Sequence, residues 1–433
     1  MKPFALAILV ALASVGTLAD QARPRLLGIG PSSAALFDDS ALHEIRLVVN
    51  SQDWGSLKEH YLENTYYPAD FRWRGQNVRG VGIRSRGGVS RSPVKPGLRV
   101  DFDRYSTDQT FLGLKSIVLR NNTLDASNMN ERLSMLLFSR VGLPAPREAF
   151  TTLYVNNEYV GLYTIVESID KSFLRRVRGE DEGYLYEYVW EKPYYFEYRG
   201  SDPKLYVPLP FEPETHEDDP RPEFIEQLVW TINETNDAVF RTAIAEYLDL
   251  AKFIRHVAIE TFIEENDGFL GYAGMANFYF YRFANMKLFT FIPWDKSESL
   301  KDGFRRSIFH NITDVPDSQQ NRLLRRALSY PDLYNLYLDT LLECVRSMGP
   351  PATGGPGWME SEIERQYQQI RDAARADPAK PFSNDQFESA VEFLRVFARS
   401  RGDVVADEVG RSRPQRVLRA PYWQLPLPKS RND

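Results

Sequence analysis

Apolar residues follow short alternating runs in the first half of the chain and helical spacing in the second half. Alternation of apolar and polar positions is typical of strands whose two faces have different surroundings. It predicts strands at 43–49, 67–81, 81–84, 98–102, 111–119 and 181–189, and a hairpin over 149–167 that turns at Asn156-Asn157. A helix at 129–142, which Gly142 would end, interrupts these strands.

The second half is predominantly helical. Apolar residues three and four positions apart predict helices at 224–236, 240–247, 250–263, 318–348, 358–378 and 384–406. Two short strand-like runs separate the third of these helices from the fourth, and a segment rich in proline and acidic residues precedes the first. We therefore expect an α+β protein with a β-rich N-terminal part at 41–200, a connector at 201–222 and a helical C-terminal part at 223–408.

The N-terminus indicates where the protein is located in the cell. Lys2, the apolar run 4–15 and the small residues before Asp20 predict a signal peptide over 1–19, and hence a secreted, periplasmic or cell-surface protein. An extended lead-in at 20–40 and a basic, flexible tail at 409–433 are expected to flank the folded part. After the N-terminus no apolar run is long enough for a membrane span, so no further transmembrane segment is expected.

Length, net charge and cysteine content limit which classes of protein this chain can belong to. The 433 residues suffice for two core-forming units or one large two-lobed unit. A net charge of −6 provides no overall basic field for nucleic acid. Cys344 is the single cysteine, so no internal disulfide can form and packing must stabilise the fold.

Three polar residues stand out within the apolar stretch 264–299. Asp267 follows the predicted helix 250–263, Asn277 opens the run NFYFYRF, and Asp295 closes the run KLFTFIPWD. Carboxylate and amide oxygens at the ends of neighbouring strands are hard ligands of the kind that Mg²⁺ takes. Phosphoryl transfer uses one Asp near the acceptor hydroxyl and an Asn and an Asp on the metal ions. Taken alone, each residue is also explained as a turn or cap residue.

A loop rich in glycine, serine and arginine joins the predicted strands 81–84 and 98–102. It reads Arg84-Ser85-Arg86-Gly87-Gly88-Val89-Ser90-Arg91. Glycine lets backbone N–H groups approach an anion, and arginine and serine side chains add donors. The loop matches neither the P-loop nor the dinucleotide-binding fingerprint. An exposed hairpin with solvated arginines is the alternative explanation.

Together these segments resemble the CotH-type (spore coat protein H) kinases, which are secreted or surface-associated relatives of the protein kinase fold. The resemblance runs from about Glu44 to about Ser299 and depends on the order and spacing of its pieces. They are VGIRSRGGVSRSPVKPGLRVDFD, FLGLKSIVLRNNTLDASNMNERLSMLLFSRVGLPAPR, LYVNNEYVGLYTIVESIDKSFL, GYLYE, NFYFYRF and IPWDKSES. The resemblance implies a two-lobed, protein-kinase-like α+β fold and phosphoryl transfer from ATP to protein, with Mg²⁺ or alternatively Mn²⁺.

Carried over by position, the resemblance assigns roles to individual residues. Asp267 resembles the catalytic Asp, and Asn277 and Asp295 resemble the metal-binding residues. Lys95 would bind phosphates and pair with Glu131. The complete nucleotide-binding set would be Arg86, Gly87, Gly88, Ser90, Lys95, Glu131 and Glu167. Glu167 would accept hydrogen bonds from adenine or ribose, or only cap the turn that follows it.

Two departures from the family pattern leave other functions open. The loop at 86–90 lacks one hydroxyl, and the ten positions from Asp267 to Asn277 exceed the usual catalytic-loop spacing of protein kinases. A secreted binding or adhesion protein on a degenerate kinase scaffold is one alternative, because a fold does not fix a function. Transfer of another group from ATP, such as AMP, is a second alternative.

Overall fold

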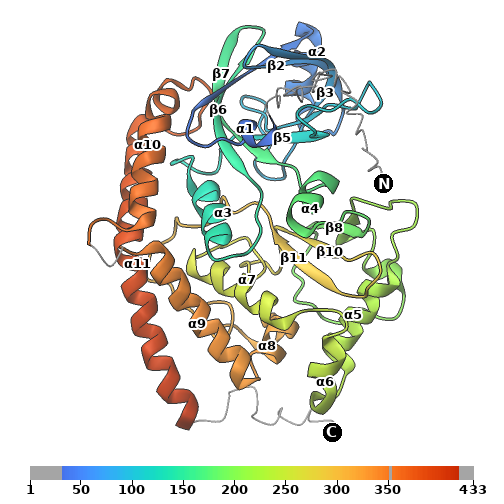
Figure 1. Ribbon diagram of the computed structural model, residues 1–433, viewed down its shortest axis with the longest axis vertical. Coiled ribbons are helices and arrows are strands. Elements are labelled where there is room, and N and C mark those ends of the chain that lie inside the picture. The colour runs from blue at the N-terminus through green and yellow to red at the C-terminus, as the bar shows by residue number, and fades with distance from the viewer. Residues whose placement is uncertain (1–31, 351–353, 419–433) are drawn as a thin grey trace, which may run out of the picture.

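The computed structural model describes residues 32–350 and 354–418, and the signal peptide predicted at 1–19 lies outside them. The described chain is α+β, with strands dominating the N-terminal region and helices the C-terminal region (Figure 1). Where an extended lead-in was expected, a short helix α1 (Ser33–Leu36) forms. It does so because Leu36 and Phe37 are buried in the core of the N-terminal region.

Seven strands of the N-terminal region close into a barrel, in the order β1-β2-β3-β4-β5-β7-β6. All neighbours are antiparallel except β1 and β6, whose parallel pairing closes the barrel. The strands are β1 (His43–Val49), β2 (Tyr67–Trp73), β3 (Gln76–Ser85), β4 (Leu98–Asp101), β5 (Ser116–Arg120), β6 (Glu148–Val155) and β7 (Glu158–Glu167). Closure leaves this sheet without a free edge.

The predicted strand 43–49 is confirmed with its boundaries, and its alternating residues are buried inside the barrel. The hairpin predicted at Asn156-Asn157 joins β6 to β7, and both turn residues have positive φ, 52° and 69°. Such a turn matches the twist of the strands it connects. Outside the barrel strands, the N-terminal region contains α2 (Ser51–Glu59) and the long helix α3 (Asn130–Arg140).

A second, four-stranded sheet has the order β11-β10-β8-β9 and takes two of its strands from before residue 223, where the C-terminal part was expected to begin. Its strands are β8 (Tyr184–Tyr188), β9 (Phe211–Pro213), β10 (Phe278–Arg282) and β11 (Phe289–Pro293). Every residue of β10 and β11 is buried, so the aromatic alternation reflects two covered faces. The surrounding helices are α4 (Lys171–Arg178), α5 (Glu223–Glu234), α6 (Asp237–Ile244), α7 (Leu250–Phe262), α8 (Arg322–Ala327) and α9 (Pro331–Met348), with 3₁₀ turns at Pro203–Leu205 and Asp317–Gln319.

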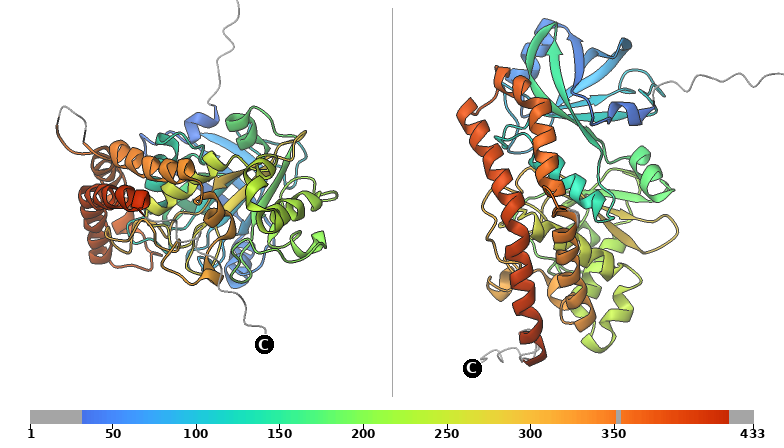
Figure 2. Two further views of the ribbon diagram at one scale, coloured as in Figure 1. Left: turned by 90° about the horizontal axis from the view of Figure 1, so that it is seen from below. Right: turned by 60° about the vertical axis from the view of Figure 1, so that its left-hand side comes forward.

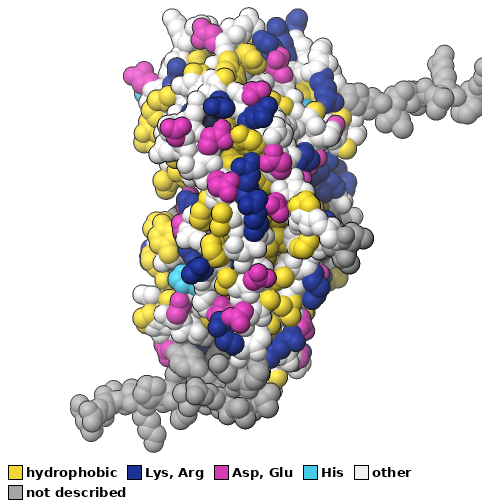
Figure 3. Space-filling model, turned by 90° about the vertical axis from the view of Figure 1, so that its left-hand side faces the viewer, with side chains coloured by type: hydrophobic (Ala, Val, Ile, Leu, Met, Phe, Trp, Pro, Cys, Tyr) yellow, Lys and Arg dark blue, Asp and Glu magenta, His cyan; other side chains and the backbone are white. Residues whose placement is uncertain are grey.

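Helices α10 (Trp358–Ala376) and α11 (Asn384–Leu418) form a hairpin that runs along the side of the molecule from the barrel past the C-terminal region (Figure 2). Helix α11 continues beyond residue 409, where a flexible tail was expected, because Val405 and Val409 are buried in the helical core. On the face that carries these two helices, acidic and basic side chains are interspersed (Figure 3). None of the described helices is both long enough and apolar enough to span a membrane.

Candidate functional site

The β10–β11 hairpin brings Asn277 and Asp295 to the same end of the second sheet. Asn277 directly precedes β10, Asp295 follows β11, and Phe278 is paired with Pro293. The Trp294 backbone N–H donates to the Asn277 carbonyl at 3.3 Å, which continues the pairing by one step. Asn277 and Asp295 have φ of 55° and 46°. Asn and Asp tolerate this left-handed region better than most residues, so the local sequence suits the sharp turns here.

Asp267 joins the same group from the loop that follows α7. The Asn277 side-chain amide donates from Nδ2 to the Asp267 carbonyl at 2.6 Å and to Asp267 Oδ2 at 2.9 Å. The Asp267 backbone N–H in turn donates to Glu265 Oε1 at 2.8 Å. The three residues singled out in the sequence therefore lie together around the end of one hairpin.

The two aspartates have different electrostatic surroundings. Burial, followed by the nearby charge of Asp295, raises the pKa of Asp267 to about 6. Burial also disfavours the ionised form of Asp295, but the Arg120 guanidinium outweighs it and lowers the pKa of Asp295 below its usual value. Near pH 6, Asp295 is therefore ionised and Asp267 is about half protonated.

Arg120, at the end of β5, is the cation closest to Asp295. Its Nη1 lies 2.8 Å from Asp295 Oδ2, and its Nε contacts the Glu131 carboxylate at the start of α3. Its guanidinium also lies 5.5 Å from the centroid of the Trp294 ring. The structure thus gives Glu131 a basic partner, but the partner is Arg120 and not Lys95.

Lys95 does not reach Glu131, because a carboxylate from a distant segment holds it elsewhere. Its side chain is 1% exposed, and its Nζ lies 2.6 Å from Oδ2 of Asp377, in the connection between α10 and α11. The same Asp377 oxygen accepts the Leu162 backbone N–H of β7 at 2.9 Å. At Gly161, a β-carbon would come within 2.6 Å of that oxygen, so glycine makes room for the contact. Lys95 thus links the barrel to the C-terminal helical hairpin.

The glycine-rich loop extends toward Asp295 through Arg86. The Arg86 guanidinium lies 4.9 Å from the centroid of the Trp294 ring, which Arg120 also approaches, and its Nη2 lies 3.5 Å from Glu187 Oε1. After the stronger effects of burial and Arg120, the charge of Arg86 also contributes to the lowered pKa of Asp295. Two arginines, one from the loop and one from β5, therefore face the hairpin end.

The remaining loop residues are held in a defined conformation. Gly87 has φ of 122°, and a β-carbon there would lie 2.6 Å from Ser90 Oγ, whereas one at Gly88 would meet nothing within 4 Å. Arg91 Nε donates to the Gly87 carbonyl at 2.7 Å, and Asn121 Nδ2 donates to the Ser90 carbonyl at 2.8 Å. One loop carbonyl is thus bound from within the loop and another from Asn121, just after β5.

Glu167, at the end of β7, is bound by two arginines. Arg147 Nη2 lies 2.7 Å from its Oε1, and Arg176 Nη2 lies 2.5 Å from its Oε2. The Arg147 backbone N–H adds a further bond to Oε2 at 3.1 Å. Both carboxylate oxygens therefore already accept hydrogen bonds, as expected for a residue that fixes the chain after β7.

Sequence reasoning missed a buried ionic network behind Asp267. Lys296, next to Asp295, is fully buried, with its Nζ 2.7 Å from Glu260 Oε1 and 3.0 Å from the Asn277 carbonyl. The other Glu260 oxygen accepts the Phe269 backbone N–H at 2.8 Å, so this pair fixes the loop that carries Asp267. Burial works against the charge of Glu260, yet Lys296 and His256 lower its pKa to about 2. The signal in the sequence was a carboxylate four residues after His256 on an apolar helical face.

The donor set at the hairpin end suits a hard divalent cation. Within the described residues, no group of three or more His, Cys, Asp or Glu side chains forms a metal cluster. Asp267, Asn277 and Asp295 offer two carboxylates and one amide carbonyl, which matches the few protein ligands that Mg²⁺ uses besides water and phosphate oxygens. Burial and then repulsion from Asp295 raise the pKa of Asp267, and a bound cation would relieve the repulsion.

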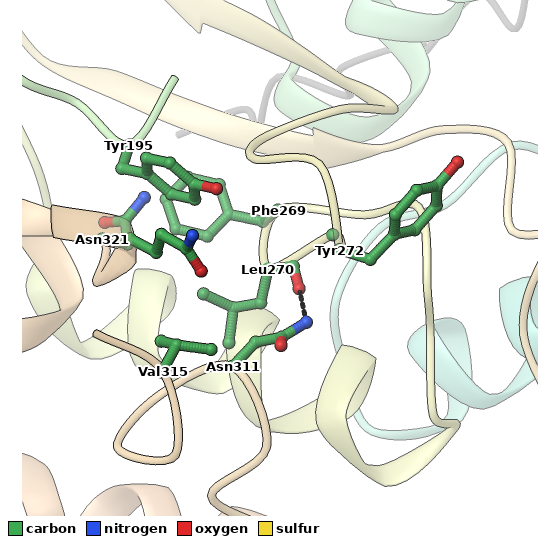
Figure 4. A pocket seen from close by; sticks show the side chains of 9 residues that line it. Tyr195, Phe269, Leu270, Tyr272, Asn311, Val315 and Asn321 are labelled. Carbon is green, nitrogen blue, oxygen red and sulfur yellow. Dashed lines mark hydrogen bonds between the residues drawn. The ribbon is translucent and has the colours of Figure 1, made fainter. Parts of the chain in front are cut away.

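A small pocket of about 30 Å³ lies beside the loop that carries Asp267 (Figure 4). Phe269, Leu270 and Tyr272 line it on the loop side, and Asn311 Nδ2 donates to the Leu270 carbonyl at 2.8 Å. Tyr272 is 76% exposed, so the loop presents an aromatic surface to solvent next to the candidate site.

Known proteins match most of this chain, including the residues of the candidate site. A profile of the family described as CotH kinase protein matches residues 83–405, which include Arg86, Asp267 and Asp295. The chain belongs to the CotH kinase family. Inner spore coat protein H of Bacillus subtilis (strain 168) is 24% identical to this CotH family chain over 379 residues, which is 86% of this chain and 99% of that protein. The family match thus covers the barrel from the end of β3 onward and most of the helical region.

Proposed function

We propose that this CotH family chain transfers a phosphoryl group from ATP to a serine or threonine hydroxyl of a protein, with Mg²⁺ bound at the hairpin end. The observation that supports this proposal most directly is the cluster of Asp267, Asn277 and Asp295, joined to Glu131 through Arg120. Phosphoryl transfer requires mostly positioning and charge neutralisation, and these residues supply both.

The order of elements around this cluster favours a two-lobed, protein-kinase-like arrangement. A glycine-rich loop joins β3 to β4, the next strand, β5, ends in a basic residue, and the following helix, α3, carries its acidic partner. In protein kinases a strand lysine and a helix glutamate form the corresponding ion pair. In this chain Arg120 takes the place of the lysine, and a guanidinium can hold a carboxylate and a phosphate oxygen at once.

In this proposal, separate residues bind the phosphates and the metal ion. Arg86 and the backbone of the loop that it begins would bind the terminal phosphates, and Arg120 would hold Asp295 in place. Asn277 and Asp295 would hold Mg²⁺, which when bound neutralises charge on the phosphates.

Asp267 would position the acceptor hydroxyl and take its proton. The hydroxyl oxygen forms a bond to the γ-phosphorus, the bond from that phosphorus to the β–γ bridging oxygen breaks, and ADP departs with the electron pair. A carboxylate whose pKa lies near 6 is mostly ionised at neutral pH and still basic enough to accept a proton late in this step.

We also propose that the protein acts outside the cytoplasm. The predicted signal peptide at 1–19 supports export, and the Bacillus subtilis relative is described as an inner spore coat protein. N-terminal sequencing of the mature protein tests this. A start near Asp20 supports export, and an intact Met1 in the functional pool contradicts it.

The enzymatic proposal is tested with purified protein, labelled ATP and Mg²⁺ or Mn²⁺, followed by mass spectrometry of the modified protein. Gain of a phosphate supports the proposal, and gain of AMP indicates transfer of the nucleotide instead. Asp267→Asn should keep Mg²⁺-dependent nucleotide affinity and lose turnover by about 10²-fold or more, because its role is confined to the transition state. Asp295→Asn should lose metal-dependent nucleotide binding itself.

Lys287→Gln provides a surface control for both variants, since Lys287 lies in the turn at the opposite end of the β10–β11 hairpin, where its side chain is 45% exposed and pairs with Glu246 at 3.3 Å. If neither aspartate variant changes transfer by an active protein, the assignment of the hairpin end is wrong. If the wild-type protein neither binds nucleotide nor modifies any protein, the binding or adhesion scaffold becomes the better description.

A further inference from the structure

A second pocket, of about 190 Å³, lies between the β10–β11 hairpin and α7. Its walls are mainly apolar and include Phe253, Phe283, Phe289 and Phe291. His256, which is 2% exposed, also lines it. A cavity of about 150 Å³ with such walls can hold a benzene-sized molecule. This pocket therefore has room for a six-membered ring with one small polar substituent.

Arg178, the last residue of α4, gives the pocket a positive charge. Among the described residues it forms no ion pair with a carboxylate, and its Nε is buried without a hydrogen-bond partner. Its one side-chain hydrogen bond runs from Nη2 to Thr290 Oγ1 at 3.3 Å, to a residue that also lines the pocket. Leaving a buried guanidinium donor without an acceptor is costly, so the site is suited to an anionic partner.

The other charged residues of the pocket do not supply that partner. Asp249 lines it, but its carboxylate caps α7 by accepting the Ala251 backbone N–H at 3.0 Å and the Lys252 N–H at 3.2 Å. The Lys252 Nζ lies 3.6 Å from Asp249, so these two charges offset each other. Asp249 is therefore occupied by α7 and Lys252, and the charge of Arg178 is not offset by a carboxylate that lines the pocket.

We propose that this pocket binds a small organic carboxylate, with the carboxylate on Arg178 and an apolar body of about benzene size against the phenylalanine walls. Arg178 provides a fork of N–H donors that matches a carboxylate. The apolar walls exclude ligands that are only anionic, such as phosphate, because such ions would lose hydration without compensation. The site is separate from the hairpin end that carries Asp295, and the proposal does not depend on kinase activity.

Titration calorimetry of the full chain with benzoate tests the proposal, with benzamide as the neutral molecule of the same shape. A ligand of about nine non-hydrogen atoms can reach affinities of about 1 mM or tighter. We expect saturable benzoate binding and at least about tenfold weaker benzamide binding, since one charge-assisted contact is lost.

Arg178→Gln should weaken benzoate binding by about 10- to 100-fold. Arg175→Gln on the same helix is the matched control, because that side chain is 65% exposed and pairs with Asp181 outside the pocket. Leu143→Trp, which fills the pocket while keeping Arg178, should abolish binding. Equal binding of benzoate and benzamide, unchanged binding by Arg178→Gln, or no saturable binding of benzoate would each overturn the proposal and leave a pocket filled with water.

Discussion

Arg120 contacts Glu131 and lies 2.8 Å from Asp295, so a single guanidinium joins β5, α3 and the end of the β10–β11 hairpin. Its side chain is 10% exposed, and burial raises the pKa of Glu131 well above its usual value despite the nearby guanidinium. Arg120 thus connects the barrel to the helical region at the candidate site.

Arg120→Met is expected to destabilise the fold by about 3–5 kcal/mol, because it leaves buried carboxylates without their cation. Urea denaturation measures this loss. The double variant Arg120→Met/Glu131→Leu should recover part of the stability, since the buried charge is removed together with its partner, but should not recover nucleotide affinity. If Arg120→Met kept wild-type stability and nucleotide affinity, the guanidinium would contribute neither to the fold nor to nucleotide binding.

Gly87 and Gly88 are neighbours that should respond differently to the same change. Gly87→Ala places a β-carbon 2.6 Å from Ser90 Oγ at a φ of 122°, so the loop must rearrange, and nucleotide affinity should fall about tenfold. Gly88→Ala meets nothing within 4 Å and should have little effect, which makes it the control. Fluorescence titration with a nucleotide analogue compares them, and equal affinities would count against a nucleotide at this loop.

Lys95→Met should reduce stability, because it leaves Asp377 as a buried carboxylate without a cation. The expected cost is about 3–5 kcal/mol. Lys115→Met is the matched control, since the pair of Lys115 with Asp103 at 3.1 Å involves a lysine that is 61% exposed. A surface pair of this kind contributes at most about 1 kcal/mol. Similar denaturation midpoints for the two variants would refute the structural role of Lys95.

The pH dependence of stability should reveal Asp267. Its pKa in the folded protein is raised from 3.8 to about 6, so folding favours the protonated form, and this contribution to stability is lost as pH rises through 6. Asp267→Asn has no proton to lose. In the absence of metal, its melting temperature relative to wild type should therefore increase between pH 4.5 and pH 7.5. A difference that is constant over this range would mean that Asp267 titrates normally.

The proximity of Asp267, Asn277 and Asp295 could be predicted from the sequence because the relevant signals are local. Asn277 and Asp295 flank two strands joined by a short turn, and antiparallel pairing necessarily brings such ends together. Asp267 could be placed near them from its position after an apolar helix. In each case a short stretch of chain determines where the residue lies.

The partner of Glu131 could not be predicted in the same way. Lys95 and Arg120 are both basic and both lie near strand ends, and the choice between them depends on Asp377, which is 282 positions from Lys95 in the sequence. The network of Lys296 and Glu260 has a similar origin, because its charges resemble ordinary surface charges until the fold buries them. Pairing between distant charges depends on tertiary packing, and alternation of apolar residues carries no information about it.

The contact of Lys95 with Asp377 has a consequence for how the protein is made. A ribosome releases the barrel strands long before it reaches residue 377, so during synthesis the barrel lacks the carboxylate that neutralises its buried lysine. Contacts between such distant positions form late, since a long loop must close before they do. The nascent barrel should therefore stay open to unfolding, and to chaperones, until nearly the entire chain has been synthesised.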